Sequence, residues 1–266
     1  MAITGSGTQA DPYIVDTWTD FVSVFNENNK YITFPADTVF DFNEIQDYAN
    51  KLTGRTNTID GNGVCFENVT LSSGTFLSAT NKNTFSNIDF KNLYFSGDSN
   101  FISSSNNNSW VRFVNCKFSG IFQGTSHFNY SGDNTYFGVD INSVGCGFNL
   151  KFMEQAKFKA SAYSLYFYNC QIILDYGTSQ TEQAWRIANS LVLGRIKNGT
   201  WNFNATNSII NAEITTDLTN SNASSVSVIN FDKIGEGGTY SGFTAVTTVQ
   251  LKDESYLQSI NFPIGV

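Results

Sequence analysis

Phe113-Val114-Asn115-Cys116-Lys117-Phe118 is the stretch that decides the fold, because its pattern returns along most of the chain. The pattern reads apolar, any residue, Asn, small or apolar, any residue, apolar. Its copies place a marker residue at these positions: Asn68, Asn92, Asn115, Gly145, Asn169, Asn189, Asn207 and Asn230. Successive markers stand 18 to 30 residues apart, with an average of about 23, so the chain is an internal repeat.

This period is typical of a parallel β-solenoid, in which short strands of successive coils stack on one another. Asn and Gly tolerate the left-handed backbone conformation of a sharp turn, so we predict such turns along the whole marker column. Stacked Asn side chains can also hydrogen-bond along the column. Cys116, Cys146 and Cys170 each follow a marker, and we predict that they point inward at one place in successive coils.

A second column keeps step with the first. Phe76-Leu77-Ser78, Phe101-Ile102-Ser103 and Ile121-Phe122-Gln123 recur at spacings of 25 and 20 residues. Two columns in phase over three repeats are hard to obtain by chance, even in a chain with 24 Phe. We therefore expect these three segments to occupy equivalent strands of neighbouring coils.

Composition supports strands rather than helices. Aromatic residues make up 15% of the chain and charged residues only 14%, which excludes a disordered protein. Phe, Asn, Thr, Ser and Gly are poor helix formers. The only prolines are Pro12, Pro35 and Pro263, so the repeat region carries none. This absence fits central strands, where each backbone amide donates to a neighbouring strand.

Charge and cysteine usage narrow the partners. The net charge of −8 argues against a nucleic-acid partner, because binding phosphates needs a basic surface. No apolar run is long enough for membrane insertion, and the first residues lack a secretory signal, so we expect synthesis in a bacterial cytoplasm. Cys65, Cys116, Cys146 and Cys170 form no C-x-x-C, and His127 is the single histidine. We therefore expect free thiols, no metal and no cofactor.

The repeat leaves two flanking segments that can close its ends. Residues 1–45 are predicted to form an N-terminal cap, with a short helix over 16–28 that gathers four apolar side chains on one face: Trp18, Phe21, Val22 and Phe25. Residues 46–234 are predicted to form the coils, and 235–266 a C-terminal cap with a helix over 251–260. We expect all three parts to make one domain.

The two ends also carry a resemblance. The opening residues 5–8 (GSGT) and 11–15 (DPYIV) resemble the start of right-handed parallel β-helix proteins encoded by phages and by bacterial surface genes. Residues 251–257 and 261–264 are similar to the closing segment of that group, and 59–63 (IDGNG) resemble the first coils of pectin-degrading β-helices. The resemblance implies an all-β fold, a right-handed parallel β-helix that we estimate at about nine coils. It also implies a virion component.

The sequence does not predict an enzyme. Arg195-Ile196-Lys197 matches a tripeptide of polygalacturonases, but no Asp-Asp pair accompanies it, and His127 lacks flanking glycines. Glycosidic hydrolysis needs two neighbouring carboxyl groups, and the outward positions next to the markers bring none together. No Gly-x-Ser-x-Gly elbow supports a serine nucleophile either. We read the tripeptide as a chance match.

The longest repeat, from Asn115 to Gly145, predicts a loop that projects from the coils. Loops on a rigid scaffold often carry binding residues. The candidates for contact with a partner or glycan are His127, Tyr130, Asp133, Tyr136 and Asp140. Trp110, Trp185 and Trp201 could serve as glycan platforms, but we predict packing in the core or at a subunit interface.

These features lead us to expect a non-enzymatic structural protein of a bacteriophage virion, decorating the capsid or associated with the head. Its expected partners are other capsid or tail proteins and further copies of itself, for instance in a trimer. The alternative is a phage tail or spike protein that binds, or even cleaves, a host surface polysaccharide. A third reading, a bacterial surface protein, predicts a signal peptide in the full gene.

Overall fold

The computed structural model describes residues 3–54, 56–79, 81–104, 110–131, 134–140, 142–153, 155–158, 165–177, 183–197, 199–222 and 225–263. Most of them lie in two long sheets, here called sheet A and sheet B. The strands of sheet A are, in spatial order, β1 (Tyr13–Ile14), β2 (Lys30–Thr33), β5 (Asn57–Asp60), β8 (Lys82–Ser86), β10 (Trp110–Val114), β13 (Asn134–Phe137), β15 (Leu165–Tyr168), β17 (Gln183–Ala188), β19 (Thr200–Thr206), β21 (Asp217–Asn220) and β23 (Thr239–Ser241). Those along sheet B are β3 (Val39–Asp41), β6 (Cys65–Glu67), β9 (Asp89–Ser104), β11 (Lys117–Phe122), β14 (Gly147–Phe152), β16 (Gln171–Tyr176), β18 (Leu191–Ile196), β20 (Ile209–Ile214), β22 (Val228–Asn230) and β24 (Thr244–Val246).

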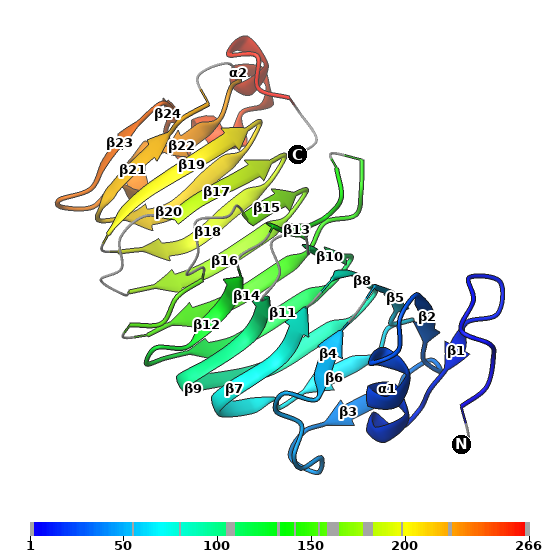
Figure 1. Ribbon diagram of the computed structural model, residues 1–266. Coiled ribbons are helices and arrows are strands. Elements are labelled where there is room, and N and C mark those ends of the chain that lie inside the picture. The colour runs from blue at the N-terminus through cyan, green and yellow to red at the C-terminus, as the bar shows by residue number, and fades with distance from the viewer. Residues whose placement is uncertain are drawn as a thin grey trace.

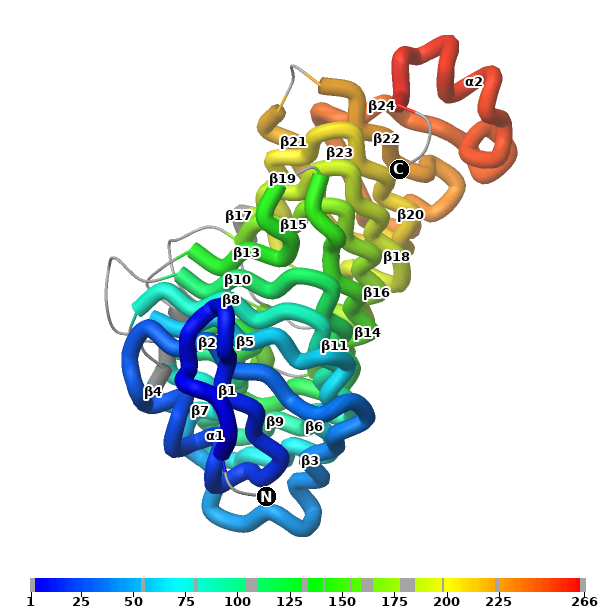
Figure 2. Tube along the Cα trace, turned by 90° about the vertical axis from the view of Figure 1, so that its right-hand side faces the viewer, coloured from blue at the N-terminus to red at the C-terminus, as the bar shows by residue number. Residues whose placement is uncertain are grey.

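The chain passes back and forth between the two sheets, and each sheet grows in chain order (Figure 1). Paired strands within each sheet run parallel, as in β14 against β16 and β18 against β20. Figure 2 shows the same path along the tube, with the two ends of the chain at opposite ends of an elongated molecule. The predicted all-β fold with stacked parallel strands is confirmed at this level.

A third row of strands widens the first half of the molecule. The long strand β9 pairs from Tyr94 onward with β7 (Thr70–Ala79) and from Asn100 onward with β12 (His127–Ser131), and β7 pairs in turn with β4 (Leu52–Gly54). The repeat between hydrogen-bonded equivalents is accordingly 27 and 28 residues at Asp60–Asn87–Asn115. It falls to 20 and 18 residues at Cys170–Ser190–Ser208. The average of about 23 therefore combines a wide half and a narrow half.

Stacked aromatic rings fill the space between the sheets. Phe118 lies between Phe90 and Phe148, with ring centroids 5.0 Å apart on both sides and interplanar angles of 6° and 10°. In-register parallel strands place like residues about 4.8 Å apart, which is the distance at which rings stack. Trp185 and Trp201 are 0% and 1% exposed, so they belong to this core and are not glycan platforms.

The predicted helices occur at both ends. Helix α1 (Trp18–Phe25) has Thr17 as N-cap, whose Oγ1 accepts from the Asp20 N–H at 3.1 Å. It packs against β2 and β4. Phe21 and Phe25 are buried as predicted, Trp18 and Val22 are partly buried against the same core, and Val24 is buried as well. The C-terminal helix is interrupted: a 3₁₀ turn, η2 (Gln250–Lys252), precedes α2 (Glu254–Ser259). Asp253 caps α2, because its Oδ1 accepts from the backbone N–H of Tyr256 at 3.1 Å.

The marker column proves to be two columns. Four markers turn the chain from sheet A to sheet B with a φ near +50°: Asn115, Asn169, Asn189 and Asn207. The true neighbour of Asn115 is Asn87, whose Oδ1 accepts from Asn115 Nδ2 at 2.7 Å. Asn68 and Asn92 also have positive φ but lie on the sheet B side, where β9 shifts register against β11. The turn from sheet A to sheet B and the register shift within sheet B both have Asn between apolar residues, so the sequence pattern placed them in one column.

Two markers do not adopt the predicted left-handed conformation. A Cβ on Gly145 would stand 2.2 Å from the backbone oxygen of Asn169, so close backbone approach requires this glycine. Asn230 has φ −72° and caps the 3₁₀ turn η1 (Phe231–Lys233) by accepting from the Asp232 N–H. The left-handed prediction was wrong for Gly145 and Asn230.

The prediction that three segments form a second column is correct for two of them. Leu77 pairs with Ile102 and Ser78 with Ser103, as the spacing predicted. Ile121 pairs instead with Tyr94, on the first half of β9. The true counterpart of Phe101 is Phe128, whose ring stacks on it at 5.1 Å. The chain inserts β11 before reaching this third row, and a fixed spacing could not reveal that.

Candidate functional site

The segment expected to project as a loop is mostly strand. Residues 117–122, 127–131 and 134–137 form β11, β12 and β13, each paired with a neighbour. His127 is only 8% exposed and its ring lies 4.8 Å from that of the half-exposed Tyr130. Burial, together with the nearby Lys157 cation, lowers the pKa of His127 to about 4. His127 is therefore a neutral, packed side chain at neutral pH, and the projecting-loop prediction was wrong.

The other predicted contact residues lie elsewhere. Tyr136 stands on the outer face of sheet A, where its ring stacks on Tyr166 at 4.5 Å. Asp140 is exposed near the turn to sheet B, and its backbone oxygen accepts from Asn169 Nδ2 at 3.4 Å. Asp133 lies outside the described residues. The described candidates thus occupy three places and form no common site.

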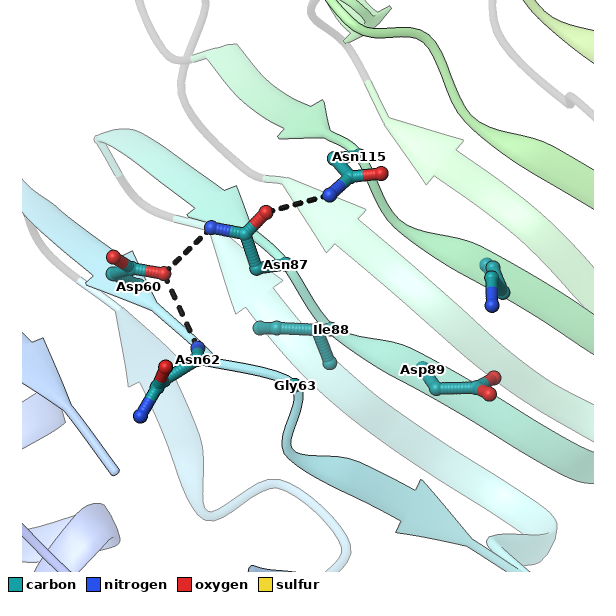
Figure 3. A pocket seen from close by; sticks show the side chains of 8 residues that line it. Asp60, Asn62, Gly63, Asn87, Ile88, Asp89 and Asn115 are labelled. Atoms are coloured by element: carbon teal, nitrogen blue, oxygen red, sulfur yellow. Dashed lines mark hydrogen bonds between the residues drawn. The ribbon is translucent and has the colours of Figure 1, made fainter. Parts of the chain in front are cut away.

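A hollow of about 430 Å³ opens at the turn from sheet A to sheet B (Figure 3). Asp60 Oδ1 accepts from the Asn62 N–H at 3.2 Å and from Asn87 Nδ2 at 2.8 Å. Asn87 Oδ1 accepts in turn from Asn115 Nδ2. These side chains bond to one another along the column, as Figure 3 shows, and so stabilise the turns. The ladder accounts for four of the polar residues that line the hollow, and the other two, Asp89 and Lys117, take no part in it.

The outer face of sheet B carries shallow hollows and paired charges. One hollow of about 440 Å³ includes Asp175 and Arg195, whose carboxylate and guanidinium are 2.6 Å apart. The parallel register places Arg195 between Asp175 and Glu213. Lys197 reaches Glu213 at 3.5 Å. Arg195 and Lys197, the basic residues of the polygalacturonase-like tripeptide, therefore form ion pairs, and the Arg195 guanidinium lies between the carboxylates of Asp175 and Glu213. Asp41 and Glu67 are register partners on β3 and β6.

The buried cysteines belong to a ladder of backbone-to-side-chain hydrogen bonds. The Cys146 N–H donates to Cys170 Sγ at 3.4 Å, and the Cys170 N–H donates to Ser190 Oγ at 3.0 Å. The Ser190 N–H donates to Ser208 Oγ, and the Ser208 N–H to Ser227 Oγ. The cysteine thiols and the serine hydroxyls thus both accept a hydrogen bond from a backbone N–H at the same inward position. The predicted inward placement of the cysteines is confirmed.

All four cysteines are free, and three of them are buried. Burial raises the pKa of the Cys116 and Cys170 thiols well above their ordinary value, and it raises that of the half-buried Cys65 to about 11. Within the described part of the chain, no three His, Cys, Asp or Glu side chains gather closely enough to hold a metal ion. These thiols are structural rather than reactive.

The outer face of sheet A presents a row of aromatic and basic side chains. Register aligns Arg112, Tyr136, Tyr166 and Arg186 on the consecutive strands β10, β13, β15 and β17. The Arg112 guanidinium lies 3.9 Å from the Trp110 ring centroid, and that of Arg186 lies 5.0 Å from the Tyr166 centroid. From the sequence, only two of these residues stand out: Tyr136, as part of a projecting loop, and Trp110, as a residue packed in the core or at a subunit interface. Trp110 is instead half-buried on this outer face. Aligning the strands on their buried Val111, Thr135, Leu165 and Trp185 would have revealed the rest.

In the described ranges, no helix is both long and apolar enough to cross a membrane. No protein-family model matches the chain, and neither a curated protein nor a solved structure matches it significantly.

Proposed function

We propose that sheets A and B are two faces of a right-handed parallel β-helix that serves as a non-enzymatic structural protein of a bacteriophage virion. The alternation of consecutive strands between the sheets supports a β-helix, since each time the chain returns to sheet A its new strand pairs with the preceding strand of that sheet. Right-handedness follows the strong rule for parallel crossover connections. Sheet A has eleven described strands, and eight of them lie within residues 46–234, the range that we expected to form the coils.

The observation that carries a structural role is the continuity of the interior. Ring stacks such as Phe90–Phe118–Phe148 are continued by Ile172, Val192 and Ile210 in the same register. The Cys–Ser ladder runs beside them through the narrow half. A close-packed interior of this kind resists bending and proteolysis, which suits a rod that holds position on a particle.

The surface of sheet B supports the non-enzymatic reading. A glycosidase needs two carboxyl groups facing one sugar ring. Asp175 and Glu213 instead stand on either side of Arg195, and Arg195 and Lys197 form ion pairs with them. Asp41 and Glu67 are register partners, but the Asp41 carboxylate accepts from Asn68 Nδ2 and that of Glu67 pairs with Lys91. In this proposal the rod decorates the capsid or head and contacts other virion proteins, with further copies of itself as neighbours. The tail or spike alternative gains support from the row on sheet A, which is considered below.

Crosslinking mass spectrometry on purified particles tests the virion role. A lysine-reactive reagent reports on each face separately, because Lys82 is exposed on sheet A while Lys117 and Lys151 are exposed on sheet B. We expect crosslinks from one of these faces to a major capsid or head protein. Crosslinks to tail components alone would favour the alternative, and crosslinks to bacterial envelope material without any virion protein would overturn the proposal.

A further inference from the structure

The middle of the outer face of sheet A is positively charged, although the whole chain is negatively charged. The protein carries a net charge of −8. From β8 to β19, however, the described residues on the outer face of sheet A include three cations, Lys82, Arg112 and Arg186, and no carboxylate. The nearest outward carboxylates in the strand order belong to Asp60 on β5 and Asp217 on β21. A basic band therefore crosses the middle of an acidic molecule.

The two arginines of this band are held in place by aromatic rings rather than by acids. Arg112 lies between Trp110 and Tyr136, at 3.9 and 5.5 Å from their ring centroids. Arg186 covers the far side of the Tyr166 ring. Cation–π contacts orient a guanidinium without neutralising its charge. Neither arginine forms an ion pair with a described carboxylate, and Arg112 Nε is buried without a hydrogen-bond partner.

The band forms a straight row across the strands. Arg112, Tyr136, Tyr166 and Arg186 occupy one register position on four neighbouring strands. Strands in a sheet are about 4.8 Å apart, so the arginines stand roughly 14 Å apart at the backbone. The Tyr136 and Tyr166 rings stack on each other, which turns their edges outward. The row thus offers a cation at each end and phenol groups between.

We infer that this row is a binding site for an acidic polysaccharide chain that lies across the strands of sheet A. The carboxylates of a uronic acid polymer recur along its length, so one segment can reach both Arg112 and Arg186. Guanidinium groups bind carboxylates through paired, charge-assisted hydrogen bonds. The sugar hydroxyls between them meet the two tyrosines, and the side chain of Asn204, next to Arg186 on β19, meets hydroxyls beyond that arginine.

Other polyanions fit this face less well. An extended peptide binds by adding a strand to a free sheet edge, whereas β10, β13, β15 and β17 are paired on both sides. A duplex nucleic acid needs a broad basic surface to replace its counterions, and the chain is acidic overall. The inference goes beyond the structural role proposed above and does not depend on it, because a glycan can bind the rod whether or not a particle carries it.

The test is titration of the full chain with polygalacturonate by isothermal calorimetry at low ionic strength. The key variant is Arg112→Gln/Arg186→Gln, and the matched control is Arg195→Gln/Lys197→Gln, which changes the net charge equally on the face of sheet B. We expect binding by the wild-type chain and the control within a factor of two. The key variant should weaken binding at least tenfold, and about 0.15 M salt should weaken the wild-type interaction. Neutral dextran should not bind.

Circular dichroism establishes that both variants keep the wild-type fold, which these exposed or half-exposed positions should allow. Failure of wild-type binding, or equal loss in the two double variants, would overturn the inference. Polyglutamate that competes as well as polygalacturonate would also overturn it, because the site would then recognise charge on a peptide. None of these results bears on crosslinking to virion proteins, so the two proposals fail separately.

Discussion

Ser190→Ala tests whether the buried Cys–Ser ladder stabilises the stack of strands. Ser190 Oγ accepts from the Cys170 N–H at 3.0 Å and donates to the Ala188 oxygen at 2.8 Å, and Ser190 is 1% exposed. Alanine removes both bonds but only one heavy atom, so it leaves almost no cavity. The Cys170 N–H loses its acceptor in a dry interior, which costs about 1–3 kcal/mol.

Ser190→Cys is the matched control for this prediction. Cys170 Sγ already accepts from the Cys146 N–H at the same inward position, so a thiol at 190 keeps an acceptor in the ladder. We expect Ser190→Cys to lower the free energy of unfolding by less than about 1 kcal/mol. Urea unfolding followed by circular dichroism measures both variants against the wild-type chain. The reasoning fails if Ser190→Ala is as stable as wild type, or if the cysteine variant is destabilised as much as the alanine variant.

Three further predictions concern single sites. Gly194 and Gly63 both have a φ near +90°, but a Cβ at 194 would stand 1.9 Å from the Leu174 oxygen, while one at 63 meets nothing within 4 Å. Thermal melts should show that Gly63→Ala destabilises the chain by about 1–2 kcal/mol and that Gly194→Ala destabilises it by clearly more. Equal losses of stability in the two variants would contradict the clash. Because the pKa of His127 is lowered to about 4 in the folded state, the unfolded chain binds more protons below pH 6.5, so the free energy of unfolding should fall by about 1–3 kcal/mol from pH 6.5 to 4. Urea titrations should show a smaller fall in His127→Gln; an unchanged pH profile in that variant would assign the loss to other groups. A thiol reagent at pH 8 should label Cys65 first and the three buried cysteines only after unfolding, whereas rapid labelling of Cys116 or Cys170 in the native chain would contradict their burial.

The interior was predictable because stacking constrains it strongly. A buried position in one strand lies directly over its equivalent in the next, so both tend to accept the same residue type. Phe90, Phe118 and Phe148 show this, and so do Cys146 and Cys170. Such constraints leave a visible period in the sequence, and from it the parallel, all-β arrangement and the inward cysteines could be predicted.

The register of the repeat was less predictable, because two different turns use the same residues. A turn from sheet A to sheet B and a bulge within sheet B both need a residue in the left-handed backbone conformation, and in both places that residue is Asn. Asn92 and Asn115 therefore look equivalent in the sequence although they lie in different columns. The copy that resolves the register, Phe85-Ser86-Asn87-Ile88-Asp89-Phe90, comes just before Asn92. Its hydrogen bond to Asn115 fixes the alignment that spacing alone left open.

The row on sheet A was hidden for the opposite reason. Outward positions contact only their neighbours on adjacent strands, so their identities can change from strand to strand without disturbing the core. Arg112, Tyr136, Tyr166 and Arg186 do not repeat a single residue type along the row, and they become one surface only when the buried side chains have fixed the register. From β8 to β19, the outer face of sheet A gathers cations and aromatic rings and no described carboxylate, although the chain is acidic overall. Packing of the core does not explain this composition. This is the physical reason to look for a ligand on sheet A rather than in the hollows of the turns or of sheet B, where Asp60, Asn87 and Asn115 bond to each other and Asp175 pairs with Arg195.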